Sequence, residues 1–131
     1  MYKTIVCAIE ASEEGKMVLE KASEFARLFG AKLFVTHVIP YQLLPKDYQK
    51  ELEETAAPKI ESLTSALEIS RKNVSISFGK PYEKICKLAL EKEADLIILG
   101  THSKKGLQGL IGSTANGVTN YAKCDVTLIK I

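Results

Sequence analysis

Continuous apolar runs and amphipathic stretches alternate along the chain. Apolar runs of this kind predict strands that are buried on both faces of a sheet. One run alternates polar and apolar side chains instead, which predicts a strand near a sheet edge. The five predicted strands are residues 5–9, 33–39, 73–78 (the alternating one), 95–99 and 126–131.

Between the strands, apolar side chains recur at three- and four-residue spacing, which predicts helices with one buried face. Ser12 is expected to cap the first helix and Gly30 to end it. A long helix is expected over residues 48–67, either kinked or split at Pro58. Pro81 fits the first position of a third helix, because its missing N–H has no partner there in any case.

Strands that alternate with helices predict a parallel sheet with helices on both faces. Right-handed crossovers then give an open, doubly wound α/β sheet of five strands, expected in the order 3-2-1-4-5. In such sheets, ligands bind beyond the carboxyl ends of the strands, where the strand order reverses. We therefore expect one domain over residues 1–131, with a crevice between the first and fourth strands.

A glycine-rich segment, GTHSKKGLQGLIGS, leaves the fourth strand at Gly100 and enters a last helix expected over residues 113–122. Glycine-rich turns and helix N-termini both present unpaired backbone N–H groups, so this segment is a candidate anion cradle. The hydroxyls of Ser113 and Thr114 are candidate donors to phosphate. The alternative interpretation is a surface loop with solvated lysines and a serine N-cap.

Two titratable side chains, Glu10 and His102, lie near the expected crevice, and a third, His37, lies within the second strand. Glu10 could contact a ribose, an adenine or a magnesium shell, or it could cap the first helix. His102 could donate to phosphate or hold the loop through a backbone contact, whereas His37 is expected to be a satisfied core residue. Neither histidine has a second ligand at a suitable spacing, so no transition-metal site is expected.

Composition argues against several other classes of protein. The formal net charge of +2 and the absence of long like-charge runs argue against a nucleic-acid binder. Nothing resembles a signal peptide or an apolar membrane span, so a cytoplasmic protein without a membrane partner is expected. The 3 cysteines lack CxxC spacing and are expected to be reduced, buried thiols.

Motifs for nucleotide hydrolysis or phosphotransfer are also missing. No Walker A or dinucleotide-binding glycine motif follows the first strand, which continues as Ile-Glu-Ala-Ser. No phosphoacceptor aspartate follows the third strand, where the chain reads Phe-Gly-Lys-Pro. Since no nucleophile–base pair is evident, we expect no enzyme, and at most slow incidental hydrolysis of ATP.

The whole chain resembles the universal stress protein family. The matching motifs are YKTIVCAIEAS (residues 2–12), HV (37–38), GKP (79–81), ADLIILGTH (94–102), GSTAN (112–116) and CDVTLIK (124–130). The resemblance implies a flavodoxin-like fold and a cytoplasmic homodimer. In relatives the dimer often pairs the last strand, which here begins at Val126 and ends at Ile131, and pairing would cover an apolar sheet edge.

Members of this family divide into ATP binders and members that do not bind ATP. The binders resemble one another in Gly-x-x-Gly, about nine residues and then Gly-Ser/Thr. Here the first motif runs from Gly100 to Ser103, and eight residues separate it from Gly112. Serine thus replaces the second glycine, the spacing is one residue shorter, and Glu10 stands where aspartate is usual.

The resemblance implies that ATP or AMP, with or without Mg²⁺, binds in the crevice. The implied binding residues are Ala8, Ile9, Glu10, Val38, Leu99, Gly100, His102, Ser103, Gly112, Ser113 and Thr114. The expected function is a small stress-response protein whose nucleotide occupancy regulates a surface read by an unknown protein partner. One alternative is a dimeric interaction protein with a vestigial loop, and another is a slow ATP hydrolase.

Overall fold

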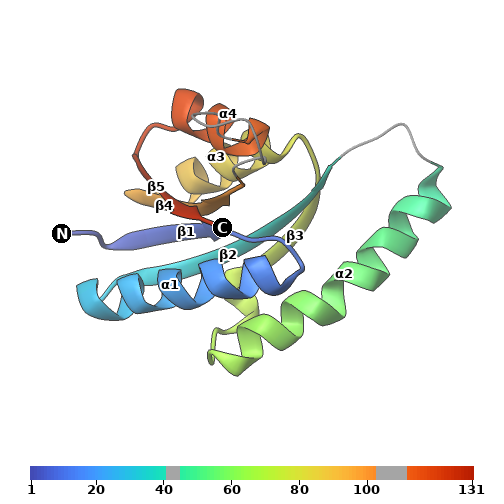
Figure 1. The fold of residues 1–131 in the computed structure, drawn as a ribbon, viewed down its shortest axis with the longest axis horizontal. Coiled ribbons are helices and arrows are strands. Elements are labelled where there is room, and N and C mark those ends of the chain that lie inside the picture. Colours follow the sequence, from blue (N-terminus) through green and yellow to red (C-terminus); the bar gives the residue numbers. More distant parts are fainter. Residues whose placement is uncertain (41–44, 103–111) are drawn as a thin grey trace.

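The computed structural model describes residues 1–40, 45–102 and 112–131. Its strands are β1 (Thr4–Ala8), β2 (Lys32–Pro40), β3 (Val74–Gly79), β4 (Leu96–Thr101) and β5 (Asp125–Lys130). Its α-helices are α1 (Glu13–Phe29), α2 (Lys46–Ala66), α3 (Pro81–Glu91) and α4 (Ser113–Tyr121), and a short 3₁₀ turn covers Arg71–Asn73. All strand pairs are parallel, in the order β3-β2-β1-β4-β5 (Figure 1), so the predicted fold class and strand order are confirmed.

The core divides into two clusters, one on each face of the sheet. Alternate residues of the central strands supply them, because successive strand side chains point to opposite faces. Ile5 and Cys7 face the cluster that α1 and α2 cover, whereas Val6, Ile97 and Leu99 face the cluster under α3 and α4 (Figure 1). Burial on both faces explains why β1 and β4 are unbroken apolar runs.

The two predicted ends of α1 are confirmed. The Ser12 side chain accepts a hydrogen bond from the Gly15 N–H at 3.3 Å, which satisfies one unpaired donor of the first turn. Gly30 follows the helix with φ of 64°, a left-handed conformation that glycine adopts without a Cβ penalty. Well-defined ends place α1 firmly against the carboxyl end of β1.

Helix α2 is not split at Pro58, and its 21 residues form one continuous helix. Proline removes one backbone hydrogen bond, but the ring of Pro58 lies on the exposed side of the helix. Ala56, Ile60 and Thr64 are buried on the opposite side. Because Ala56 precedes Pro58 and Ile60 follows it, the turns on both sides of the proline are buried and the helix continues through it.

Other predicted boundaries differ from the structure by one or two residues. The last strand is Asp125–Lys130 rather than residues 126–131, and α4 ends at Tyr121. The serine N-cap of the alternative interpretation is not seen, because Gly112 is the N-cap of α4 and no side chain caps this end. None of the helices in the described part of the chain is long and apolar enough to cross a membrane.

Candidate functional site

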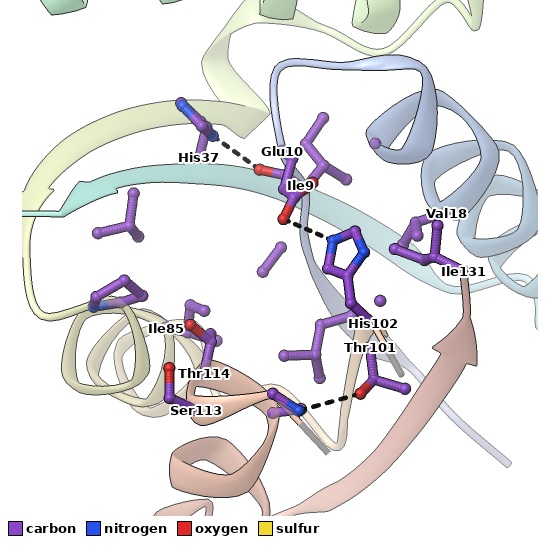
Figure 2. A pocket seen from close by; sticks show the side chains of 18 of the residues that line it. Ile9, Glu10, Val18, His37, Ile85, Thr101, His102, Ser113, Thr114 and Ile131 are labelled. Atoms are coloured by element: carbon purple, nitrogen blue, oxygen red, sulfur yellow. Dashed lines mark hydrogen bonds and ion pairs between the residues drawn. The ribbon is translucent and has the colours of Figure 1, made fainter. Parts of the chain in front are cut away.

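A pocket of about 370 Å³ lies at the carboxyl ends of β1, β2 and β4, where the strand order reverses (Figure 2). The N-termini of α3 and α4 close it on one side. Its lining consists of Ala8, Ile9, Glu10, Gly15, Val18, His37, Val38, Pro40, Pro81, Ile85, Leu99, Gly100, Thr101, His102, Gly112, Ser113, Thr114, Ala115 and Ile131. The pocket therefore occupies the crevice expected from the strand order.

The structure brings ten of the eleven sequence-predicted residues together in this lining. They are Ala8, Ile9, Glu10, Val38, Leu99, Gly100, His102, Gly112, Ser113 and Thr114. The eleventh, Ser103, and the neighbouring lysines of the loop lie outside the described residues. Their common position does not show what they bind, so their roles toward a ligand stay predictions.

Sequence reasoning missed the other lining residues for two reasons. Thr101 and Pro81 stand at a strand end and a helix start that border the crevice, so the switch-point rule could have included them. Val18 and Ile131 reach the pocket only through tertiary packing around Gly100, for which the sequence carries no signal. His37, expected in the core, is half-buried and lines the pocket.

Gly100 has a packing reason to be glycine. A Cβ at this position would lie 2.3 Å from Ile131 Cδ1 and 2.9 Å from Val18 Cγ2, so both side chains would have to shift to make room for it. The Ile131 N–H also donates to the Thr101 carbonyl at 3.1 Å, which continues the β4–β5 ladder past the end of the strand. Close packing of α1, β4 and the segment after β5 therefore forms this wall of the pocket.

Three contacts fix the backbone just after β1. The Ile9 N–H donates to the Thr36 carbonyl at 3.0 Å, and His37 Nδ1 donates to the Ile9 carbonyl at 2.8 Å. Gly15 packs so closely that a Cβ there would lie 1.8 Å from the Glu10 carbonyl oxygen. His37 is thus hydrogen-bonded as predicted, with its proton on Nδ1 because a carbonyl can only accept.

The N-terminus of α4 presents backbone donors to the pocket. The Gly112 N–H donates to Thr101 Oγ1 at 3.4 Å, and the helical ladder starts with the Asn116 N–H on the Gly112 carbonyl at 2.9 Å. The N–H groups of the first turn have no partner within the helix, and this turn has no acidic residue. With the positive end of the helix dipole, they form a favourable environment for an anion.

Glu10 and His102 contact each other across the crevice. His102 Nε2 lies 3.0 Å from Glu10 Oε1, and the two side chains are 50% and 57% exposed. Figure 2 shows the pair spanning the gap between the segments that follow β1 and β4. Of the two alternatives for Glu10, capping of the first helix is not seen, because Ser12 is the N-cap of α1. The alternative backbone contact of His102 with the loop lies outside the described residues.

Neither a metal site nor a reactive thiol is evident among the described residues. No group of three His, Cys, Asp or Glu side chains among them could hold a metal ion. All three cysteines are free thiols, and Cys7 is buried as expected, whereas Cys86 and Cys124 are only half-buried. Burial raises the pKa of all three thiols above the ordinary value, which disfavours the nucleophilic thiolate, and none of them lines the pocket.

Comparison with known proteins decides the family. The sequence profile of the universal stress protein family matches residues 1–130. The chain belongs to the universal stress protein family. The predicted resemblance is thereby confirmed over nearly the whole chain.

Similar family members come from several organisms. Universal stress protein A homolog 1 of Coxiella burnetii is 29% identical over 140 residues, which span 98% of this chain and 96% of that protein. A universal stress protein of Thermus aquaticus is 30% identical over 137 residues, 99% of this chain and 100% of that one. Both matches extend over the full fold, so the pocket lies within the shared region.

Solved structures agree with the fold. The structure of MJ0577 from Methanocaldococcus jannaschii has a TM-score of 0.83 and 26% identity, covering 100% of this chain and 97% of that one. A universal stress protein solved in complex with cAMP has a TM-score of 0.70 and 20% identity, covering 98% and 97%. At this lower identity the likeness concerns the fold.

Proposed function

We propose that this universal stress protein binds an adenine nucleotide, ATP or AMP, in the pocket between β1 and β4. The observation that carries the proposal is the uncapped N-terminus of α4, whose first-turn N–H groups border a pocket of about 370 Å³. That volume is in the range of small-molecule sites. Of the base and the phosphates of a nucleotide, the phosphates suit this helix terminus best, because they are anionic.

The rest of the lining suits a base and a sugar. Val38, Ile85 and Leu99 supply apolar surface to the pocket lining. Glu10 is the one carboxylate among the described lining residues, and a carboxylate at this position can accept hydrogen bonds from a ribose hydroxyl or an adenine amine. A fold neighbour has been solved with cAMP, which indicates that this architecture can hold an adenine nucleotide.

We propose a binding role rather than a catalytic one. Glu10 is the only carboxylate in the described lining, and its Oε1 already pairs with His102. Among the described residues, no hydrogen bond joins the hydroxyl of Ser113 or Thr114 to a histidine or a carboxylate, so no activated nucleophile stands at the α4 N-terminus. Nucleotide occupancy itself would be the signal that a partner reads.

Isothermal titration calorimetry with ATP and AMP, each with and without Mg²⁺, tests this proposal. We expect binding, and we expect Ser113→Glu to weaken ATP binding at least tenfold. The new carboxylate would lie in the exposed first turn of α4, where it suits the helix dipole but repels phosphate. The fold should therefore survive while the anion site is lost.

Thr119→Glu is the matched control, because it adds the same charge on an exposed position at the other end of α4. It should leave ATP affinity within about twofold. No heat of binding at millimolar ATP, together with no nucleotide released from denatured purified protein, would favour the interaction protein without a nucleotide. Phosphate release that disappears in Ser113→Ala or His102→Ala would instead favour the slow hydrolase.

A further inference from the structure

Among the described residues, Glu10 and His102 are two of the three titratable side chains that line the pocket. Among the described lining residues, Glu10 is the one acidic side chain, the only other titratable groups are His37 and His102, and no lysine or arginine is present. The acidic residues at the start of α1, Glu13 and Glu14, do not line the pocket. The lining contributed by α3, α4 and Ile131 has no charged side chain.

Glu10 has little freedom to withdraw from a bound ligand. Its backbone is enclosed by the Gly15 contact, and the preceding Ile9 is held on both its N–H and its carbonyl. Only rotation of the side chain remains, and Oε1 is directed at His102, 3.0 Å away. In this structure the Glu10 carboxylate lies at the crevice, where its contact with His102 holds the 57% exposed side chain.

His102 is held between the two walls of the pocket. The residue before it, Thr101, accepts from the N–H of Gly112 at the start of α4, and its carbonyl accepts from Ile131. His102 itself reaches across to Glu10, which follows β1. The imidazole therefore stands beside the carboxylate in a pocket whose other end is the α4 N-terminus.

A carboxylate in so small a space repels an anionic ligand. All charges in a pocket of about 370 Å³ lie within roughly one Debye length of one another, about 8 Å at physiological salt, so ions do not screen them fully. The repulsion increases with the number of phosphates on the ligand. Histidine is the side chain that can gain a positive charge between pH 5 and 8.

We propose that His102 determines the charge specificity of this site: its protonated imidazole neutralises Glu10 and so allows the pocket to accept nucleotides with several phosphates. This inference rests on the proposed nucleotide binding. It implies that ATP binding is coupled to protonation at His102. Adenosine, which has no phosphate, should bind independently of this charge.

Titration calorimetry of adenosine, AMP, ADP and ATP against the wild type and His102→Asn tests the inference. Asparagine can still donate to Glu10, but it cannot become positive. We expect ATP to bind about fivefold more weakly to the variant, the size typical of one partly exposed ion pair. The loss should shrink from ATP to AMP, and adenosine affinity should stay within twofold.

A second substitution, at Glu10, tests whether the two side chains act through each other's charge. Glu10→Gln in the His102→Asn background removes the remaining charge and should raise ATP affinity relative to adenosine affinity, which reports separately on the hydrogen bond proposed between Glu10 and the ligand. Glu14→Gln is the matched control, because it removes a carboxylate from the exposed first turn of α1 outside the pocket lining. Repeating the ATP titration at pH 7 in buffers of different ionisation enthalpy should show proton uptake in the wild type and none in His102→Asn.

The possible failures are distinguishable. If the wild type binds neither adenosine nor ATP, the proposed function fails and the inference with it. If it binds both, but His102→Asn weakens both equally, His102 merely shapes the pocket and the charge role is wrong. Equal proton uptake by the wild type and the variant would likewise overturn the inference while leaving nucleotide binding intact.

Discussion

Asp95 connects the amino ends of the two central strands through its side chain. Its carboxylate accepts hydrogen bonds from the backbone N–H of Lys3 at 3.0 Å and of Thr4 at 3.0 Å. Its own N–H donates to the Thr4 carbonyl at 3.0 Å. These backbone donors, that of Lys3 foremost, hold the pKa of the Asp95 carboxyl below its ordinary value. Asp95 thus supports the end of the β1–β4 pair opposite the pocket.

The lowered pKa gives a pH-dependent contribution to stability. Because the folded state holds the Asp95 proton less tightly than the unfolded state, the contribution is present above the ordinary aspartate value of about 3.9 and is lost as the pH falls through the lower folded value. We expect Asp95→Asn to reduce the free energy of unfolding by about 1 kcal/mol at pH 7. Urea unfolding from pH 7 to pH 2 measures whether this difference shrinks toward zero.

Glu53→Gln is a suitable comparison, since it removes a carboxylate from an exposed position on α2. It should change stability by less than about 0.5 kcal/mol at any pH in this range. A constant difference between the wild type and Asp95→Asn down to pH 2 would show that lost packing, rather than the carboxylate's hydrogen bonds, explains the effect.

Single-residue contacts were the least predictable feature of the site. Glu10 and His102 were both predicted to border the crevice, because each directly follows a central strand. Their contact was not predicted, since 92 residues separate them and the pairing depends on side-chain rotamers. Residues can therefore be assigned to the crevice from topology alone, whereas their partners require the structure.

Element by element, the sequence predicts β1 and β4 best and the ends of elements worst. Strands buried on both faces need apolar side chains at every position, which leaves a clear run in the sequence. Strand ends instead depend on the register of neighbouring strands, and so β4 continues to Thr101 alongside β5 up to Lys130. Pro58 was interpreted as a kink or a break because local propensity ignores the packing that holds α2.

Helix α2 is unevenly supported along its length. Its buried residues, Ala56, Ile60 and Thr64, lie in its second half, whereas residues 46–55 are exposed or half-buried. In Figure 1 this first half extends beyond the sheet, toward the right of the view. Since tertiary packing supplies most helical stability in proteins, the first half should open more easily than the second.

Amide hydrogen exchange followed by mass spectrometry or NMR tests this expectation. Amides of residues 50–55 should exchange at least tenfold faster than those of residues 60–66, and both sets have partners within the helix. Adding ATP should leave this ratio unchanged, because no residue of α2 lines the pocket. Equal protection of the two halves would mean that another molecule covers the first half in solution.

At the scale of the whole molecule, the outer edge of β5 is the feature that bears on self-association. The sheet ends at β3 on one side and β5 on the other, and each edge strand leaves a row of backbone groups without a strand partner among the described residues. Val126, Thr127 and Leu128 in the middle of β5 are half-buried within one chain. An edge of this kind favours pairing with another strand unless something covers it.

We therefore predict that the protein is a homodimer paired through β5. Thr127→Lys places a charge at the middle of this edge, on a half-exposed position that the single chain tolerates. It should weaken dimerisation at least tenfold in sedimentation equilibrium while leaving the far-UV circular dichroism unchanged. Ser77→Lys makes a comparable change on the opposite edge strand, β3, and should leave the dimer intact. A wild type that stays monomeric at high micromolar concentration, or equal weakening by both substitutions, would contradict pairing through β5, because only this edge is expected to meet the second copy.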